Sequence, residues 1–392
     1  VGAWVGRTGL LWLAILAVAA VARLAFVAIV PPVFVWVDGQ DYDRMVRLLV
    51  DHHTYGLQTL RAPGYPTLMA ASYLVFGKSL LALRIVEAML STLAVGILGA
   101  TGTRLFGLRA GLLAAALMAV HPVLAFLPST EFPENTVVLT MVLSLWAAAG
   151  GLRQGGWWNW ALTGTFLGLG LLVRANLIAI IPGFAIGAAF ALARERRGWI
   201  GPLALCGVTL ALVLAPWIVR NHHVHGRWGF IATGGGRQLW YAHNADTDGS
   251  TRLIPKPDST MQAEMQALPN DYAVESYFYR RGLEYMREHP VRAARLYLIR
   301  LGNLFALHPE PVTRAFVSVW SRLAQALASL VVYAGALLAL RRWRTHAVLW
   351  PMVGGIVTFS LVNAMFFMNM RYRMSFEPCL LLMAGLGYAN TL

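Results

Sequence analysis

Apolar runs of about twenty residues, each bounded by charged residues or proline, recur along most of the chain, and a helix of this length crosses a hydrocarbon core. The chain is therefore expected to be an all-α polytopic membrane protein with one transmembrane domain over residues 1–392. The pattern predicts ten spanning helices, near residues 9–30, 81–103, 110–127, 132–150, 157–173, 176–193, 199–219, 317–340, 346–368 and 375–391.

Two longer polar segments, residues 31–80 and 220–316, interrupt the apolar runs. In the second segment, V-R-A-A-R-L-Y-L-I-R places Arg292, Arg295 and Arg300 at helical spacing. This pattern favours an amphipathic helix that lies on the membrane surface and does not cross it. The apolar residues that follow Asp38 in the first segment also repeat at helical spacing, so a surface helix is expected there too.

The composition and the distribution of charge fit a membrane protein. Hydrophobic residues make up 58% of the chain and charged residues 13%, against roughly 25% charged in soluble domains. The net charge of +14 does not indicate a nucleic-acid partner, because no basic run is interleaved with aromatic residues. Short loops rich in arginine usually lie on the cytoplasmic side of a membrane. Alternate short loops of this chain carry arginines, so we expect them, and the N-terminus with Arg7, to lie inside. These arginines are Arg104, Arg109, Arg153, Arg194, Arg196, Arg197, Arg341, Arg342 and Arg344.

Polar motifs follow in order at the predicted external ends of the helices. The first loop reads W-V-D-G-Q-D-Y-D from residue 36, so Asp38 and Tyr42 share one face of a helix that begins at Asp38. Further motifs are R-A-P-G-Y-P at 61–66, T-E-F-P-E-N-T at 130–136, G-L-G-L-L-V-R-A-N at 168–176, P-W-I-V-R-N at 216–221, F-I-A-T-G-G-G-R-Q-L-W-Y-A-H-N at 230–244, H-P-V-R-A-A-R at 289–295 and R-Y-R-M-S-F-E-P at 371–378.

This ordered set resembles the GT-C membrane glycosyltransferases, specifically the branch of protein mannosyltransferases and aminoarabinose transferases, which use sugars linked to a polyprenyl phosphate. The resemblance covers nearly the whole chain. It implies a GT-C bundle of about ten transmembrane helices with two large external loops that bear interfacial helices. It also implies a glycosyltransferase of the inner or plasma membrane with an external or periplasmic active site. The expected partners are a polyprenyl-phosphate sugar donor, membrane lipid, and an acceptor glycan, lipid or protein.

Transfer of a sugar to a hydroxyl group requires a carboxylate that accepts the proton. The resemblance points to Asp38 for this role. In the family, the first-loop aspartate is often followed directly by a second acidic residue, whereas here Gly39 follows Asp38 and Asp41 comes three residues later. Asp41 is therefore the alternative base. Asp38 then has the alternative role of capping the helix that follows it.

The lipid phosphate that leaves needs cations to hold its charge. Arginines at external helix ends run against the positive-inside trend, which makes them candidates for binding the donor. The alternative is that they pair with Glu131, Glu134 or Glu377, or extend to water. The candidate donor-binding residues are Arg174, Arg220, Arg371, Tyr372 and Arg373.

Two glutamates complete the candidate site. Glu131 and Glu134 are spaced one helical turn apart at a predicted helix mouth, with Glu131 as a catalytic candidate. Glu134 and Tyr42 are candidates for binding the acceptor or lining its pocket. Alternatively, the glutamates stabilise the positive end of the helix dipole and Tyr42 belongs to an interfacial aromatic belt. Arg61, in the proline-rich turn, is interpreted as structural.

No metal-ligating residue is assigned. His222, His223 and His225 lack both an acidic partner nearby and the spacing of a zinc signature. No cofactor is certain, and a divalent metal remains a candidate because some relatives use one.

Two other functions use similar residues. A ligase or polymerase of lipid-linked glycans would also need external arginines. A glycolipid transporter usually shows inverted repeats and polar residues at the bilayer midplane. No repeat is found here, and the charges inside predicted spans include Arg23, Arg84 and Glu87, of which the last two can pair with each other.

Overall fold

The computed structural model describes residues 2–34, 37–57, 59–250, 255–307, 318–342 and 345–391, and these residues form helices and loops without any strand. Arg344 and the end of the second polar segment, 308–316, lie outside the described residues. The helices are α1 Gly2–Ile29, α2 Val37–His52, α3 Gly64–Phe76, α4 Leu80–Phe106, α5 Leu108–Val120, α6 Pro122–Phe126, η1 Leu127–Ser129, α7 Glu134–Arg153, α8 Trp157–Val173, η2 Ala175–Ile180, α9 Ile181–Arg194, α10 Ile200–His225, α11 Gly235–Ala242, α12 Ser259–Gln266, α13 Asp271–Glu288, α14 Pro290–Leu304, α15 Val319–Leu340, α16 Leu349–Asn363, η4 Met370–Ser375 and α17 Glu377–Ala389.

The predicted all-α membrane architecture is confirmed. Among the described residues, six helical segments are long and apolar enough to cross a membrane: α1, α4, α7, η2 with α9, α10 and α15. The pair formed by α5 and by α6 with η1, bent by 58°, makes a seventh if it is one span. The other three expected spans coincide with the shorter helices α8, α16 and α17. A total of ten crossings stays a prediction.

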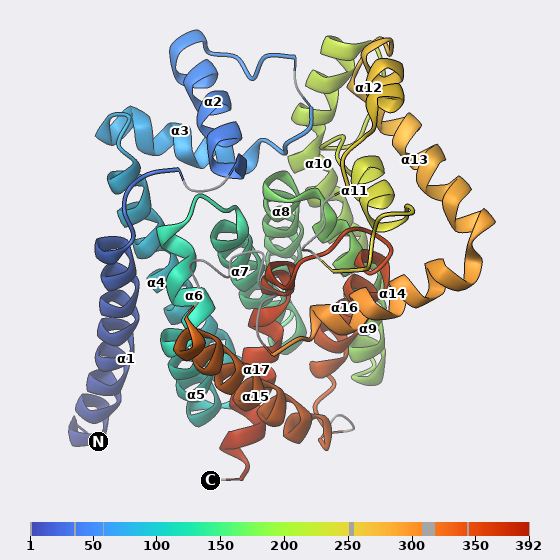
Figure 1. Cartoon of the computed structure of the whole chain (residues 1–392). Helices are drawn as coiled ribbons and strands as arrows, with labels where there is room; N and C mark the ends of the chain where they lie inside the picture. The colour runs from blue at the N-terminus through green and yellow to red at the C-terminus, as the bar shows by residue number, and fades with distance from the viewer. Residues whose placement is uncertain are drawn as a thin grey trace.

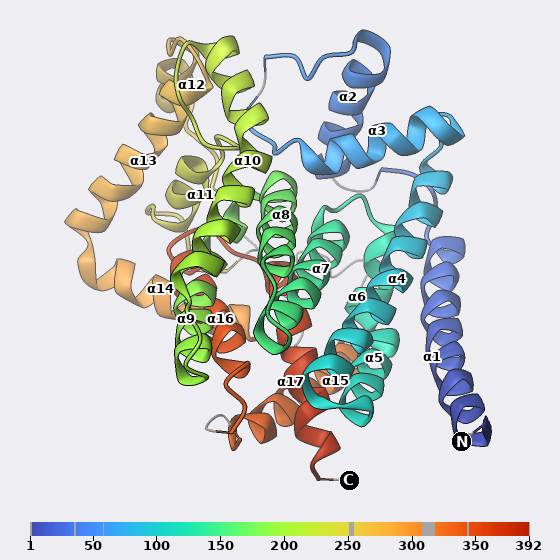
Figure 2. The same ribbon diagram turned by 180° about the vertical axis from the view of Figure 1, so that it is seen from behind.

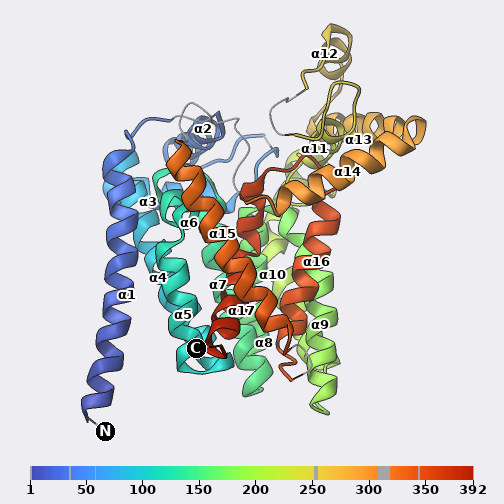
Figure 3. The same cartoon turned by 60° about the horizontal axis from the view of Figure 1, so that its bottom comes forward.

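The two ends of the bundle differ in what they carry. The N- and C-termini lie at one end, together with the turns α4–α5, α7–α8, α9–α10 and α15–α16, which are the predicted inner loops (Figures 1 and 2). At the other end, α2 and α3 come from the first polar segment, and α11 to α14 come from the second (Figure 3). Helix α14 lies across this end of the bundle, as its amphipathic pattern predicts.

The bend between α5 and α6 explains a charge inside a predicted span. Pro122 has no N–H, so the carbonyl of Met118 loses its helical partner. The buried Arg23 of α1 donates to the carbonyl of Met118 at 3.3 Å and to that of Ala119 at 3.2 Å, and its Nε donates to Ser91 at 2.7 Å. Arg23 thus satisfies carbonyl groups that the break in the helix leaves without a partner, which is a structural role.

Helices α7 and α17 form the centre of the bundle and are buried along nearly their whole length. Helix α7 begins at Glu134, and η4 directly precedes α17. Glu134 and η4 therefore lie next to each other, at the end of the bundle opposite the termini. The first turn of α2 packs onto this place from outside. A Cβ added at Gly39 would lie 3.0 Å from the Cβ of Glu131. A larger residue at position 39 would be crowded there, so the glycine favours this close approach.

Candidate active site

Asp38 links the first polar segment to η4, near the end of the chain. It lies in the first turn of α2, and its Oδ1 accepts a hydrogen bond from Arg61 Nη2 at 2.6 Å. Its Oδ2 accepts one from Arg371 Nη2 in η4 at 2.9 Å. Arg61 Nη2 also donates to Asp41 Oδ2 at 3.1 Å. Among the described residues no backbone N–H donates to the Asp38 carboxylate, so this carboxylate binds arginines and does not cap the helix.

The chain of ion pairs continues into the bundle through Glu134. Arg371 Nε lies 3.4 Å from Glu134 Oε1, and Arg174 Nη1 donates to the same oxygen. Glu134 is buried, whereas the side chains of Asp38 and Arg371 are 24% and 27% exposed. Charges therefore alternate from the surface inward, and three cations balance three anions. We call this group the Asp38 cluster; its members are Asp38, Asp41, Arg61, Glu134, Arg174 and Arg371.

Aromatic rings hold the guanidinium groups of the cluster. Arg174 lies over the ring of Tyr372 at 4.2 Å, and Arg371 lies over Phe132 at 4.3 Å. Arg61 lies 5.3 Å from the ring of Tyr42, which is buried and packs edge-on against Tyr65. Such contacts keep arginine planes oriented and partly dry. Tyr42 and Tyr372 therefore both line the cluster.

The surroundings of Asp38 set its ionisation. Burial alone would raise the pKa of Asp38, but the charges of Arg371 and Arg61, together with their hydrogen bonds, outweigh it and lower the pKa to about 2. The carboxylate is thus ionised at physiological pH and ready to accept a proton, although it is a weak base while both arginines hold it. A ligand that draws one arginine away would make Asp38 more basic.

Glu131 and Glu134 do not share a helical turn. Helix α7 begins only at Glu134, so Glu131 lies in the preceding loop. Glu131 Oε1 accepts from Arg84 Nε at 2.9 Å and from its Nη2 at 2.7 Å, whereas Glu134 binds the arginines of the cluster. Arg84 is therefore not the partner of Glu87, which instead accepts hydrogen bonds from Asn135. The second oxygens, Glu131 Oε2 and Glu134 Oε2, are buried and accept no hydrogen bond from the described residues.

Two of the predicted donor-binding arginines lie outside the cluster. Arg373 is fully buried; it donates to Glu377 at 2.8 Å and to Ser329 at 3.1 Å, and it contacts no member of the Asp38 cluster among the described residues. Arg220, near the end of α10, donates to the carbonyl of Gly56 and lies over Trp217. The alternative of internal pairing describes Arg373 best, because no surface remains for a phosphate.

Arg61 is a contact of the candidate bases that the sequence did not predict. It was interpreted as part of a structural turn because Pro63 and Pro66 surround it, yet its guanidinium binds both candidate bases. The usable signal was its position: a cation in an external loop, within a motif that the resemblance had already singled out. Its distance of more than twenty residues from Asp38 hid the contact.

The side chains of the candidate site do not fit a divalent metal ion. In the ranges that the structure describes, no three His, Cys, Asp or Glu side chains come close enough to hold one. The carboxylates of Asp38, Asp41 and Glu134 are each bound by arginine, whose charge opposes that of a cation. His222 stacks on Trp228 with ring centroids 4.0 Å apart, and His225 packs against Tyr272. We therefore derive no step through a metal.

Sequence comparison identifies one family. Residues 60–219, less than half of the chain, match the family model described as dolichyl-phosphate-mannose-protein mannosyltransferase. This range includes Arg61, Glu131, Glu134 and Arg174, but neither Asp38 nor Arg371. No curated protein matches the sequence.

Solved structures share the fold. The apo oligosaccharyltransferase of Archaeoglobus fulgidus aligns with a TM-score of 0.57 and 15% identity over 97% of this chain and 50% of its own. The same archaeal protein, AglB, in complex with an inhibitory peptide and a dolichol-phosphate aligns with a TM-score of 0.56 and 13% identity over 97% and 50%. ArnT from Cupriavidus metallidurans bound to undecaprenyl phosphate aligns with a TM-score of 0.47 and 14% identity over 99% of this chain and 79% of its own.

The chain spans about half the length of the archaeal oligosaccharyltransferase, and the likeness establishes a common fold. Together with the family match, it confirms the predicted resemblance to the GT-C membrane glycosyltransferases.

Proposed function

We propose that this chain, with its GT-C fold, is a glycosyltransferase that moves a monosaccharide from a polyprenyl-phosphate donor to an acceptor hydroxyl. The reaction takes place at the outer face of the inner or plasma membrane. One observation carries the proposal: a partly exposed carboxylate, Asp38, is held between two arginines at the end of the bundle opposite the termini. That end is outside if the arginine-bearing turns are cytoplasmic.

The donor has support from the relatives. The description of the matching family names a dolichyl-phosphate-mannose donor, and a structure of the archaeal protein contains a dolichol-phosphate. Both molecules present a phosphate on a polyprenyl chain. Such a molecule keeps its tail in the bilayer while its sugar reaches the surface. A position of the Asp38 cluster at that surface, at the end of the bundle where α2 and η4 meet, would suit this donor.

In the transfer step, Asp38 accepts the proton of the acceptor hydroxyl as its oxygen bonds to the anomeric carbon. The bond between that carbon and the phosphate oxygen breaks, and the electron pair leaves with the phosphate. The lipid phosphate changes from a diester with one negative charge to a monoester with two. Arg371 and Arg174 hold the added charge, because arginine binds phosphate through paired N–H groups.

Arg371 and Arg174 have unused N–H groups with which to bind the phosphate. Of the five N–H groups of the Arg371 guanidinium, one donates a hydrogen bond within the described residues, to Asp38. Arg174 likewise donates only to Glu134 among them. A phosphate that engages Arg371 weakens its pairing with Asp38, and the pKa of Asp38 then rises. Binding of the donor thus makes the base stronger at the moment when it is needed.

Roles for the remaining candidates follow from their positions. Tyr372 packs against Arg174, one of the proposed phosphate-binding arginines. Tyr42 and Glu134 contact Arg61 and Arg371, the two arginines that hold Asp38. Asp41 shares Arg61 with Asp38 and remains the alternative base.

The test measures the transfer of labelled sugar from a panel of polyprenyl-phosphate monosaccharides, comparing the purified wild type with Asp38→Asn and Asp41→Asn. We expect Asp38→Asn to lose at least about a hundredfold in rate, as for removal of a general base. Asp41→Asn is the matched variant, since it removes a charge from the same arginine. Loss of transfer in Asp41→Asn alone would reassign the base. A wild type that binds donors without transferring sugar would favour a glycolipid transporter or a ligase of lipid-linked glycans.

A further inference from the structure

The two external segments meet at Thr59, two residues before Arg61. Thr59 is fully buried, and its N–H and hydroxyl donate to Asp271 Oδ2 at 3.2 and 3.1 Å. Its carbonyl accepts from the N–H of Thr233 at 2.9 Å, and the two threonine hydroxyls lie 3.0 Å apart. Every polar group of Thr59 is thus bound by the second external segment.

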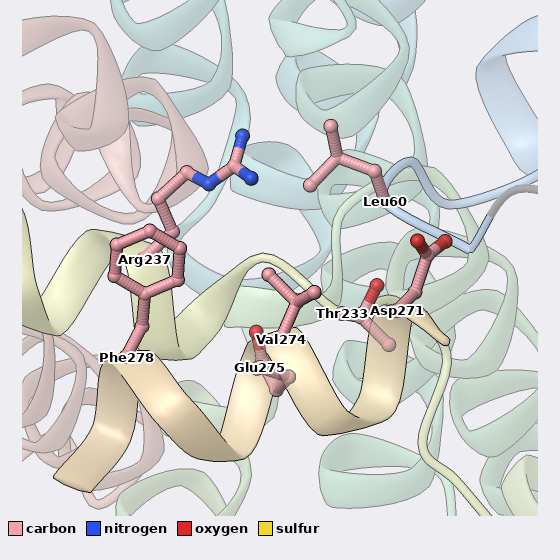
Figure 4. A pocket seen from close by; sticks show the side chains of 7 residues that line it. All are labelled: Leu60, Thr233, Arg237, Asp271, Val274, Glu275 and Phe278. Carbon is pink, nitrogen blue, oxygen red and sulfur yellow. The ribbon is translucent and has the colours of Figure 1, made fainter. Parts of the chain in front are cut away.

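The partners of Thr59 are themselves held firmly. Asp271 is the first residue of α13, whose N-cap Asn270 accepts a hydrogen bond from Ala273 at 3.0 Å. Thr233 lies just before α11, which packs closely on α13. A Cβ added at Gly236 of α11 would lie 2.2 Å from the carbonyl oxygen of Glu275 in α13. Figure 4 shows Thr233 and Asp271 next to each other, beneath the segment that carries Leu60.

The chain is fixed on the other side of Arg61 as well. A Cβ added at Gly64 would lie 2.8 Å from backbone atoms of Leu172 and Val173, so the start of α3 rests directly on the end of α8. Arg61 therefore lies on a short segment with both ends anchored. Only the anchor at Thr59 depends on side chains of the second external segment.

A cavity lies beside Thr59, but it is too small to be a substrate site that would explain the hydrogen bonds to Thr59. Its volume is about 60 Å³, and it is lined by Leu60, Arg237, Asp271 and Phe278, among others. Ligand pockets usually enclose about 300–1,000 Å³. The space holds water at most, so the hydrogen bonds to Thr59 are better explained by what they position.

We propose that Asp271 and Thr233 are positioning residues for the transfer reaction: by holding Thr59, they place the guanidinium of Arg61 against Asp38 and Asp41. This inference rests on the proposed function, since Arg61 matters to catalysis through the carboxylates that it binds. Four hydrogen bonds join the second external segment to Thr59, and Thr59 is two residues from Arg61, which binds the candidate base Asp38.

The kinetic test compares Asp271→Ala with Asp271→Asn, whose amide oxygen still accepts from Thr59. We expect Asp271→Ala to lower kcat about 10- to 100-fold with little change in KM for the donor, because misplacement of a catalytic group by about 1 Å has an effect of this size. Asp271→Asn should restore most of the rate. The matched control is Asp258→Ala, which removes an exposed carboxylate that caps α12 in the same segment.

A double-mutant cycle separates positioning from a general loss of structure. In an Arg61→Ala background, Asp271→Ala should cost less than about a further twofold, because its effect runs through Arg61. If the two losses multiply, or if Asp271→Ala transfers sugar at the wild-type rate, the proposal is overturned.

Two measurements on the full-length protein do not require activity. Hydrogen exchange of a peptide that contains Thr59 should accelerate in Asp271→Ala and stay unchanged in Asp258→Ala. Modification of Arg61 by phenylglyoxal, located by mass spectrometry, should accelerate in the same variant. If both rates equal those of the wild type, Asp271 does not position Arg61. If both rise while the wild type transfers no sugar, the proposed function fails and the placement of Arg61 stands.

Discussion

Two arginines of one short helix, Arg371 and Arg373 in η4, belong to environments that differ in every respect that matters for binding. Arg371 is 27% exposed and lies in the Asp38 cluster. Arg373 has no exposed surface and lies in a second cluster with Glu377, His121, Tyr333 and Ser329. The two residues are separated by Tyr372 alone, and the sequence analysis gave both the same role.

The difference lies in the unused hydrogen-bonding capacity. Arg373 donates to Glu377, to Ser329, to the hydroxyl of Tyr333 and to the carbonyl of Ala306, so four of its five N–H groups are occupied. Arg371 uses one within the described residues. A ligand can engage Arg371 without breaking a saturated network, whereas engaging Arg373 would expose a buried ion pair. Equal charge in one motif therefore does not mean equal function.

The substitution Arg371→Ala is expected to have the largest effect, which is on the rate of sugar transfer. Loss of a group that stabilises developing charge typically costs about 10²–10³ in rate. We expect transfer of labelled sugar to fall by this factor, with an unfolding midpoint close to that of the wild type, because the site is partly exposed. Arg371→Lys should recover only part of the rate, since lysine lacks the paired N–H groups.

Arg373→Ala is the matched variant two residues away. It leaves Glu377 buried without its cation, which destabilises proteins by about 3–5 kcal/mol. The yield of folded protein and the midpoint of unfolding should fall, while the protein that remains folded keeps its affinity for the donor. Full stability of Arg373→Ala with loss of donor binding would contradict the distinction between the two arginines.

The second prediction concerns pH and has a moderate effect. The pKa of Asp38, about 2, lies below the value of about 3.9 in unfolded chains. Its ion pairs therefore stabilise the fold above about pH 3.9, and this contribution is lost as the pH falls toward 2. The profile of kcat/KM, which reports the free enzyme, should show no acid limb from Asp38 above about pH 4.

Removing Arg61 should shift that profile. In Arg61→Ala the burial of Asp38 remains while one of its two cations is gone, so its pKa rises and an acid limb moves to higher pH. The pH dependence of kcat/KM in wild type and variant checks this. Superimposable profiles would mean that Asp38 is not the group whose ionisation the reaction requires.

The smallest expected effect belongs to Arg220→Ala. Arg220 contacts the carbonyl of Gly56, the side chain of Asn221 and the ring of Trp217, and no member of the Asp38 cluster among the described residues. Transfer should fall by less than about fivefold, because Arg220 touches no group of the Asp38 cluster among the described residues. The lost hydrogen bond should instead lower the stability of the fold, by about 1.5–3 kcal/mol. A loss as large as that of Arg371→Ala would return Arg220 to the phosphate site.

The sequence by itself determined the class of fold and the end of the bundle at which to look. Apolar runs of spanning length and arginines in alternate turns are local signals, and the helices follow them closely, except that the expected span 110–127 is broken at Pro122. Asp38 was selected in the same way, as a carboxylate that follows the first apolar run. These features depend on residues near one another in the chain, so short-range physics is sufficient to predict them.

The tertiary structure alone decided which charges meet. Asp38 and Arg371 are 333 positions apart, and Arg84 reaches Glu131 rather than the nearer Glu87. Arg61 contacts Asp38 and Asp41, whereas Arg373 pairs with Glu377 away from the cluster, because helix packing sets the direction of each side chain. Spacing along a helix predicts neighbours only within that helix. Ion pairs between distant segments depend on how helices pack, and no local pattern carries that information.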